Sequence, residues 1–275
     1  MSPQKKLHKD VLYIFLSIIA VLEISPVIIT LLNSLRTNSE IKTAAIGLPL
    51  IPQFSNYLKA WNIGGYAQAF LNSLIISCTT SCIVLIASVI SGYFLARIKC
   101  RLTRLMHVYY GFSLSISTFS FLVPLYFTFS RMNLVNSRLG IILIYTATNL
   151  PFNIILAATF IVGIPRTLDE AAIIDGCTTY ELIWKIIFPL AKPLITTVLL
   201  IVFVSTWNEF TLANTFLQLP EIKTAATKYV FFVGERGSDL SLIYSAGIIT
   251  MIPIVGIFLL LQNYFIDGLT SGSIK

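Results

Sequence analysis

The sequence predicts an all-α integral membrane protein with six transmembrane helices. Three observations support this fold class: 56% of the 275 residues are hydrophobic, the mean hydropathy is +0.84, and six separate apolar runs are long enough to cross a bilayer. A soluble domain averages about 45–50% apolar residues. Composition and run length therefore agree on a membrane protein.

The expected spans follow from the length of each apolar run, since a helix needs about 20 residues to cross about 30 Å of hydrocarbon. They lie at about 11–32, 71–96, 105–130, 139–164, 193–216 and 240–266. The first run follows a basic N-terminus, as in a secretory signal. It continues without a small-residue cleavage site, so we interpret it as a retained span. The transmembrane domain is thus expected to cover 11–266.

Basic residues at the ends of these runs predict the orientation. The connection between the second and third spans is the most basic, with Arg97, Lys99, Arg101 and Arg104. The positive-inside rule places this connection in the cytoplasm, and alternation then places the N-terminus 1–10, the segment 165–192 and the tail 267–275 there too. Because the basic residues are scattered in this way, the net charge of +7 does not indicate nucleic-acid binding.

Two long connections, 33–70 and 217–239, fall on the opposite side of the membrane. Loops longer than about 15 residues are often functional. Docking of an extracytoplasmic partner and simple flexible connection are both compatible with their composition.

The segment 165–192 carries four of the twelve carboxylates in the chain. Thr167 stands three residues before Glu170, which is the spacing of a capping box, and Thr178 has the same relation to Glu181. Gly176 lies between the two boxes, where it interrupts the helical pattern. We therefore expect two short helices around a glycine hinge.

The second of these helices has an apolar stripe at i, i+3, i+4 and i+7, formed by Tyr180, Ile183, Trp184 and Ile187. Pro189 and Pro193 are expected to end or bend it before the fifth span. An alternative is an amphipathic loop on the lipid surface, although such anchors are normally richer in lysine and arginine.

The same residues resemble a known motif. Glu170-Ala171-Ala172, three residues, Gly176, nine residues, Ile186 and a later hydrophobic-proline pair resemble the EAA motif of the permease subunits of ABC importers. Phe188 departs conservatively from the usual leucine. Four further stretches resemble the shorter permease subunit of the maltose type, in the carbohydrate-uptake branch: FLNSLIIS from Phe70, LPFNI from Leu150, WNEF from Trp207 and QNYFIDGLTSGSIK from Gln262.

The resemblance implies a type I importer permease fold with a coupling helix that docks into a cytoplasmic ATPase subunit. The residues carried over are Glu170, Ala171, Ala172, Asp175 and Gly176, with Tyr180 and Trp184 as apolar support. The implied partners are a second permease subunit, two ATPase subunits and an extracytoplasmic solute-binding protein. Together they would import a sugar or oligosaccharide by alternating access.

The C-terminal tail also resembles a family segment, one that reaches into the ATPase dimer. Its residues are Gly268, Leu269, Thr270, Ser271 and Gly272. Small residues suit such an insertion, but a frayed terminus has the same composition, so both interpretations stay open.

Polar residues within the fourth and fifth spans are candidates for the substrate path: Asn149, Asn153, Trp207, Asn208 and Glu209. Amide and aromatic groups can hydrogen-bond and stack on a sugar. Hydrogen bonding between helices explains buried amides equally well.

Glu23, within the first span, is either functional or a protonated group bonded to backbone freed by Pro26.

Nothing in the sequence indicates catalysis by this chain. There is no GxxxxGK[ST] phosphate loop, so ATP and Mg²⁺ are expected on a separate subunit, with no cofactor bound here. His8 and His107 are the only histidines, and no metal-binding cluster is expected. Two other functions stay open: a secondary transporter of a small polar solute, or an ABC importer for a non-sugar such as glycerol phosphate.

Overall fold

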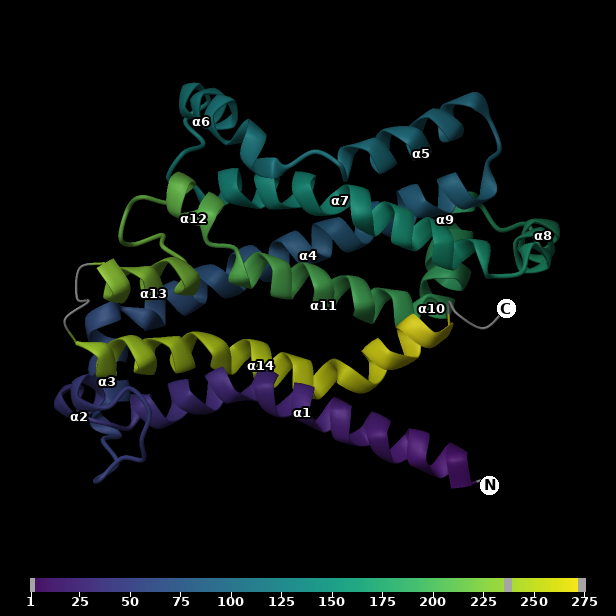
Figure 1. Cartoon of the computed structure of the whole chain (residues 1–275). Coiled ribbons are helices and arrows are strands. Elements are labelled where there is room, and N and C mark those ends of the chain that lie inside the picture. The colour runs from purple at the N-terminus through teal and green to yellow at the C-terminus, as the bar shows by residue number, and fades with distance from the viewer. Residues whose placement is uncertain (1–2, 235–238, 272–275) are drawn as a thin grey trace. The chain divides into compact units, whose positions relative to one another are not determined.

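The computed structural model describes residues 3–234 and 239–271, and every secondary-structure element in these ranges is a helix (Figure 1). Within these ranges, four segments are long and apolar enough to cross a membrane: Lys9–Ser34, Tyr66–Arg97, Arg138–Val162 and Leu240–Leu260. Counting each of two bent helix pairs as one span, Arg101–Ser113 with Thr118–Arg131 and Thr179–Leu190 with Lys192–Asn208, raises the number to six. The predicted all-α membrane fold is confirmed, and six crossings are the upper end of what the helices allow.

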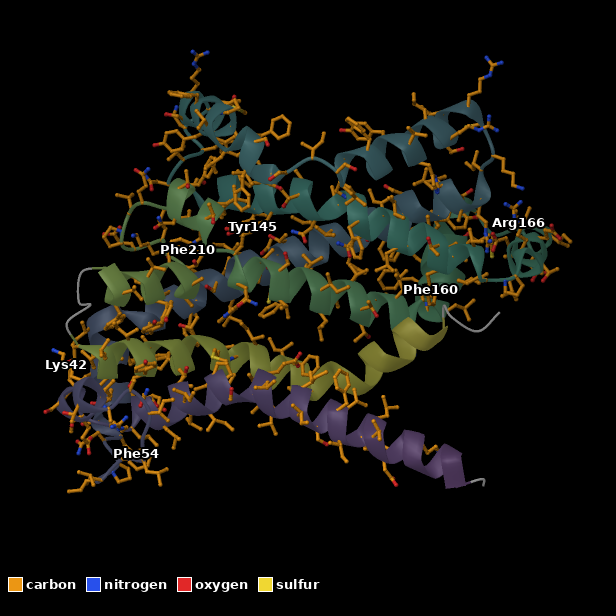
Figure 2. All side chains as sticks on the ribbon, in the orientation of Figure 1. Lys42, Phe54, Tyr145, Phe160, Arg166 and Phe210 are labelled. Carbon is orange, nitrogen blue, oxygen red and sulfur yellow. The ribbon has the colours of Figure 1, made fainter. Side chains whose placement is uncertain are left out.

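The chain divides into two compact units, Met1–Tyr66 with Lys228–Ile252, and Ala67–Thr227 with Pro253–Lys275. The first unit contains α1 (Pro3–Ser34), α2 (Asn38–Thr43), α3 (Ser55–Gly64), most of α13 (Ala225–Gly234) and the first part of α14 (Leu240–Ser271). The connection 33–70 is therefore largely helical. Lys42 and Phe54, labelled in Figure 2, lie on the segments that follow α1.

Tyr66 is the centre of the first unit. Its ring is fully buried and stacks on Trp61 at 6.1 Å and on Phe232 at 6.3 Å between centroids. Its hydroxyl donates to the carbonyl oxygen of Ala246 at 3.4 Å. This one side chain therefore joins α3, α13 and α14.

Pro26 lies inside α1 and has no N–H to donate to the carbonyl of Leu22. The hydroxyl of Ser25 donates to that carbonyl instead, at 2.9 Å. A neighbouring hydroxyl is one way in which membrane helices tolerate proline. The helix consequently continues to Ser34.

The second unit contains almost all of α4 (Tyr66–Arg97) and the helices that follow it. These are α5 (Arg101–Ser113), η1 (Thr118–Phe121), α6 (Leu122–Arg131), α7 (Arg138–Val162), α8 (Arg166–Ile174), α9 (Thr179–Leu182), η2 (Ile183–Ile187), α10 (Phe188–Leu190), α11 (Lys192–Asn208) and α12 (Thr211–Phe216). The fourth predicted span, 139–164, corresponds closely to α7. Its Pro151 lies inside the helix without ending it.

Two of the predicted spans are interrupted in the structure. The third, 105–130, consists of α5 and a second helical stretch, Thr118–Arg131, that is bent from α5 by 90°. The fifth, 193–216, breaks between α11 and α12 at Glu209 and Phe210. Irregular backbone at membrane depth is tolerated where it is buried in protein or lines a cavity. Both breaks are therefore expected to lie beside buried protein or a cavity.

Close approach of α4 and α7 depends on Gly92. A Cβ added there would lie 2.7 Å from the Cβ of Ala157 and 2.9 Å from the backbone nitrogen of Ala158. Small residues at such contacts let membrane helices pack closely.

We expect Gly92→Ala to lower the free energy of unfolding by about 1–3 kcal/mol, because the added methyl group overpacks this contact. Thermal unfolding of the purified protein measures it. Gly111→Ala is the matched control, since nothing lies within 4 Å of a Cβ there. Because alanine favours a helix more than glycine does, this variant should be at least as stable as the wild type. Equal stability of the two variants would contradict the close packing of α4 and α7.

Candidate functional site

The segment 165–192 folds as the predicted helix, glycine hinge and second helix. After α8, Gly176 adopts a φ of +83°. Its N–H donates to the carbonyl of Ile173 at 3.0 Å, and the N–H of Cys177 donates to that of Ala172 at 2.9 Å. This pair of bonds is a Schellman C-cap, which favours glycine because its φ is positive. The hinge predicted at Gly176 is confirmed.

The first predicted capping box, Thr167 with Glu170, is wrong. The helix begins at Arg166 with Pro165 as its N-cap, and the side chain of Pro165 makes no capping hydrogen bond. Proline fixes φ near the helical value and already suits the start of a helix. Thr167 consequently falls inside the first turn, where it cannot act as the cap.

Asp169 forms a buried ion pair with Arg97 at the end of α4. Nε of Arg97 donates to one carboxylate oxygen at 2.6 Å and Nη2 to the other at 3.3 Å. The same Nη2 also donates to the carbonyl of Ile164 at 3.0 Å. The two side chains are only 8% and 10% exposed. This buried pair ties α8 to the end of a membrane helix.

The second predicted capping box is confirmed at the start of α9. The hydroxyl of Thr178 accepts from the N–H of Glu181, whose carboxylate accepts from the N–H of Thr178 at 3.0 Å. Glu181 also accepts from Nζ of Lys185 at 2.8 Å. That bond, followed by the bonds from Thr178, lowers the pKa of Glu181 to about 2. The cap is therefore ionised at every physiological pH.

The predicted apolar stripe divides into two faces, because η2 is a π-helical turn and shifts the helical register. Ile183 and Ile187 are buried against α4 and α7 in a cluster that includes Tyr93 and Ile161. Tyr180, Trp184 and Phe188 form an aromatic row on the other face, at 6.1 and 4.9 Å between ring centroids. Tyr180 is 71% exposed at its outer end.

Helix α8 presents exposed apolar side chains outward. Ile173 is 63% exposed and Ile174 85%, beside the exposed Glu170, Ala171 and Asp175. We call these five residues the α8 surface. Ala172 faces the opposite way and is buried in the cluster around Tyr93. An exposed apolar patch with a polar rim is typical of a protein contact site.

The predicted tail segment is only partly described. Gly268, Leu269, Thr270 and Ser271 continue helix α14, and Gly272 lies outside the described residues.

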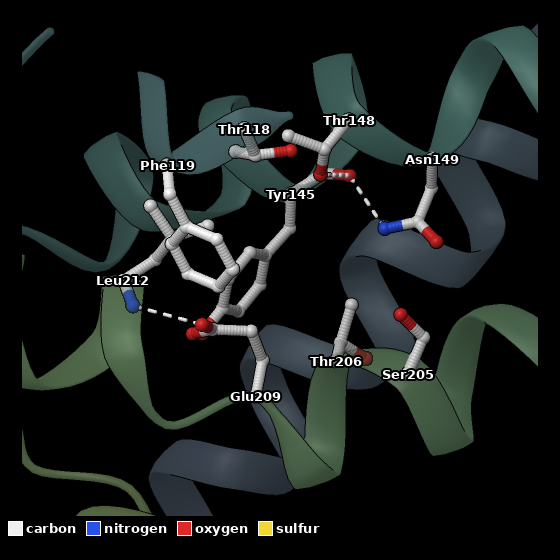
Figure 3. Close-up of a pocket in the computed structure, with 9 residues that line it drawn as sticks. All are labelled: Thr118, Phe119, Tyr145, Thr148, Asn149, Ser205, Thr206, Glu209 and Leu212. Atoms are coloured by element: carbon white, nitrogen blue, oxygen red, sulfur yellow. Dashed lines mark hydrogen bonds between the residues drawn. The ribbon is translucent and has the colours of Figure 1, made fainter. Parts of the chain in front are cut away.

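A polar cavity of about 290 Å³ lies where both interrupted spans meet α7 (Figure 3). It is lined by Thr118, Phe119, Tyr145, Thr148, Asn149, Ser205, Thr206, Glu209 and Leu212. Thr118 and Phe119 come from η1, at the break in the third predicted span. Glu209 comes from the break in the fifth. The irregular backbone at both breaks therefore borders one cavity, which is where a membrane protein tolerates such backbone.

Both oxygens of the Glu209 carboxylate accept hydrogen bonds from the protein. It accepts from the hydroxyl of Tyr145 at 2.7 Å and from the N–H groups of Leu212 at 2.8 Å and Ala213 at 2.9 Å. Glu209 thus caps α12 and links it to α7. Figure 3 shows its side chain and the ring of Tyr145 meeting on one wall of the cavity.

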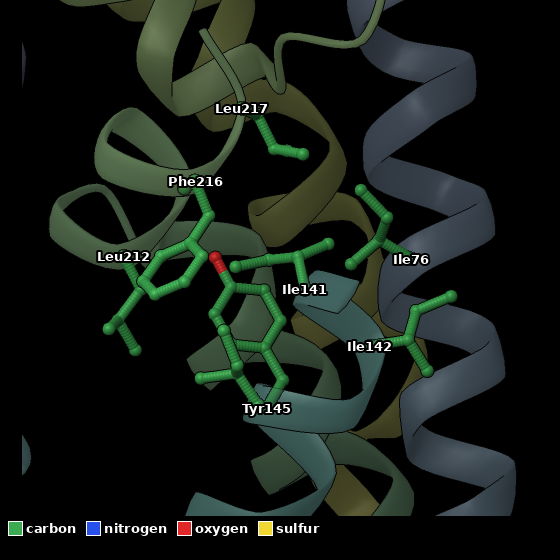
Figure 4. Close-up of a cluster of buried hydrophobic side chains, with 9 residues drawn as sticks. Ile76, Ile141, Ile142, Tyr145, Leu212, Phe216 and Leu217 are labelled. Carbon is green, nitrogen blue, oxygen red and sulfur yellow. The ribbon is translucent and has the colours of Figure 1, made fainter. Parts of the chain in front are cut away.

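Behind this wall is a tightly packed apolar cluster (Figure 4). Tyr145, Ile141 and Phe216 are each at most 1% exposed, and Ile76 of α4 packs against them. Such packing holds Tyr145 and α12 in fixed positions.

Asn149 offers the cavity a free hydrogen-bonding group. One amide N–H donates to the carbonyl of Tyr145 at 2.8 Å, and Oδ1 has no hydrogen-bond partner among the described residues. Ser205 adds an exposed hydroxyl. The lining can therefore donate to and accept from a polar solute.

The other predicted path residues lie outside this lining. Asn153 is buried and donates to the carbonyl of Asn149 at 2.8 Å, and Asn208 is exposed elsewhere on α11. Trp207 is 1% exposed and packs on Phe70 and Phe203. Sequence reasoning missed Tyr145 and the η1 residues. The signal for η1 was the serine-rich stretch 113–120 inside an otherwise apolar run.

Glu23 is exposed on α1 and makes no ion pair with the described residues. The carbonyl freed by Pro26 is already bonded to Ser25. The structure thus favours neither of the two roles considered for this glutamate.

Comparison with known proteins identifies the family. The model of the binding-protein-dependent transport system inner membrane component family matches residues 85–271. The chain is 32% identical to the melibiose/raffinose/stachyose import permease MelC of Bacillus subtilis, over 94% of each chain. It is 30% identical to the sulfoquinovosyl glycerol transport permease SmoH of Agrobacterium fabrum, over 97% of this chain and 94% of the relative.

A solved structure has the same fold. It is a bacterial ABC transporter involved in the import of the acidic polysaccharide alginate, matched with a TM-score of 0.82 over 96% of this chain and 99% of that chain, at 22% identity. Members of the family are non-enzymatic membrane subunits that work with a partner permease, an ATPase and a solute-binding protein. On the strength of the full-length relatives and the matching family model, this chain belongs to the inner membrane components of binding-protein-dependent ABC transport systems.

Proposed function

We propose that this chain is one half of a heterodimeric pore that imports a sugar or oligosaccharide, driven by two ATPase subunits and supplied by an extracytoplasmic binding protein. The observation that carries the sugar assignment is the set of near-full-length relatives. They are named for melibiose, raffinose and stachyose, and for arabinooligosaccharides. Family membership removes the secondary transporter, and a non-sugar ABC importer is the remaining alternative.

The coupling role rests on the α8 surface. Leaving Ile173 and Ile174 in water is unfavourable, and burying them in a groove of the ATPase would remove that cost. The buried pair of Arg97 and Asp169 gives α8 a firm connection to α4. Movement of the docked ATPase would therefore be passed to a membrane helix. This assignment puts the segment 165–192 and both chain termini in the cytoplasm.

The cavity beside α7 is our candidate for the part of the substrate path that this subunit supplies. Hydroxyl and amide groups of Thr118, Thr148, Asn149 and Ser205 suit the hydroxyl groups of a sugar, and the ring of Phe119 can stack on its apolar face.

We expect Asn149→Ala to raise the apparent KM for uptake about 2–10-fold, the effect of losing one hydrogen bond of about 0.5–1.5 kcal/mol. Uptake rates measured over a range of sugar concentrations give this value. Asn208→Ala is the matched control, because Asn208 is an exposed amide that does not line the cavity. If both variants have the wild-type KM, the cavity is not on the substrate path.

The sugar assignment is tested by deleting the gene and following a panel of labelled di- and oligosaccharides and glycerol phosphate. We expect accumulation of at least one sugar to be lost and to return when the chain is supplied again. Loss of glycerol phosphate uptake with every sugar unchanged would contradict the assignment and support the alternative.

A further inference from the structure

The segment that follows α1 exposes an unusual number of large apolar side chains. Six are at least 65% exposed: Ile46, Leu48, Leu50, Ile51, Phe54 and Leu58. No charged residue occurs between Lys42 and Lys59. We call these six residues the loop patch. Exposed apolar groups in such number mark a surface that meets something other than water.

Hydrogen bonds hold the segment firmly against the end of α1. Arg36 is 4% exposed, and its Nη1 donates to the carbonyl of Ala44 and its Nη2 to that of Glu40, at 2.9 and 2.8 Å. Nδ2 of Asn33 donates to the carbonyl of Ala45 at 2.9 Å. The first half of the segment is thus folded back onto the last turn of the helix.

The second half is held in the same way. Nδ2 of Asn56 donates to the carbonyls of Ser34 and Arg36 at 3.0 Å each, and the N–H of Gln53 donates to the carbonyl of Leu35 at 2.8 Å. Between the two halves, the N–H of Leu50 donates to the carboxylate of Glu40 at 3.2 Å. The loop patch is consequently an ordered surface at a fixed distance from α1.

That distance places the loop patch at the membrane boundary. The apolar run of the first span ends near Leu32, and Ser34 lies only two residues further, about 3 Å along the helix axis. The headgroup region is several ångströms thick on each side of the hydrocarbon. Residues bonded directly to Ser34, Leu35 and Arg36 therefore lie at headgroup level, where apolar side chains reach acyl chains.

We propose that the loop patch is a lipid-binding surface that inserts into the leaflet at the C-terminal end of α1. Its chemistry fits a phospholipid boundary: uncharged apolar residues enter the acyl region, while the exposed Lys42 and Lys59 at its edges meet lipid phosphates. The insertion fixes the depth of α1 in the bilayer. A solute-binding protein would be a different occupant, and the following experiment separates the two.

The test is nitroxide accessibility at Leu50→Cys and Phe54→Cys, in the assembled transporter in phospholipid nanodiscs. The background replaces Cys78, Cys82, Cys100 and Cys177 with serine. We expect apolar oxygen to reach both labels more readily than a polar nickel reagent does. Ser39→Cys, on the exposed polar side of α2, is the matched control and should give the reverse order.

Better access of the nickel reagent at both loop positions would overturn the proposal, since it would place them in water. Low access of both reagents would also overturn it, since a protein would then cover the patch. If the background without cysteines fails to assemble, the same proposal is tested with Leu50→Trp in the native background. The measurement is then the quenching of tryptophan fluorescence by brominated lipids. Quenching greater than that of Ser39→Trp supports insertion, and equal quenching contradicts it.

Discussion

Replacing Arg97 with methionine is expected to lower the free energy of unfolding by about 3–5 kcal/mol, because it leaves the buried carboxylate of Asp169 without its partner. The two side chains are 8% and 10% exposed, so water cannot readily replace the guanidinium. Uptake should fall as well, since α8 would lose its ion pair with α4. Thermal unfolding of the purified transporter and uptake by the same variant measure the two effects.

Two controls separate this role from a general effect of charge. The double variant Arg97→Met with Asp169→Leu removes both charges and should recover much of the lost stability, because no unpaired charge remains. Lys185→Ala breaks the exposed ion pair with Glu181, whose side chains are 68% and 37% exposed, and should change stability very little. If Arg97→Met is as stable as Lys185→Ala, the buried pair does not anchor α8.

Replacing Ile174 with aspartate should leave the permease folded but weaken its binding to the ATPase. Ile174 is 85% exposed, and substitutions at such positions usually change stability by no more than about 0.5 kcal/mol. Loss of a hot-spot residue at an interface costs about 2 kcal/mol or more, which corresponds to an affinity about 30-fold lower. The amount of ATPase that co-purifies with the permease, and the rate of uptake, should both fall.

Leu219→Asp is the control for Ile174→Asp. Leu219 is also an exposed apolar residue, at 50%, but it lies on the connection between α12 and α13. It should keep both ATPase binding and uptake. Wild-type ATPase recovery in the Ile174 variant would mean that the α8 surface is not the docking site.

Local sequence signals predicted the features that depend on local physics. A long apolar run forms a helix in hydrocarbon whatever lies beside it, so α1, α4, α7 and α14 follow from composition. The Gly176 hinge and the Thr178 cap depend on residues at most five positions apart. Such short-range interactions are visible in the sequence.

Features that depend on residues far apart in the chain could not be predicted in this way. Asp169 has the position of a helix-dipole carboxylate, but its partner Arg97 is 72 residues earlier. Glu209 was predicted as a path residue and lines the cavity, but its hydrogen bond from Tyr145, 64 residues earlier, could not be predicted from the sequence. The interruptions in the predicted spans could not be predicted either, because apolar composition does not show where neighbouring helices leave a cavity.

The most direct test of the coupling role is deletion of 170–176, followed by purification of the transporter and measurement of uptake. The deletion removes the α8 surface and the hinge while leaving Arg97 and Asp169 in the chain. We expect the ATPase subunits to be lost from the purified complex and uptake to stop. If the ATPase still co-purifies in normal amount and uptake continues at the wild-type rate, the segment 165–192 does not couple ATP hydrolysis to transport.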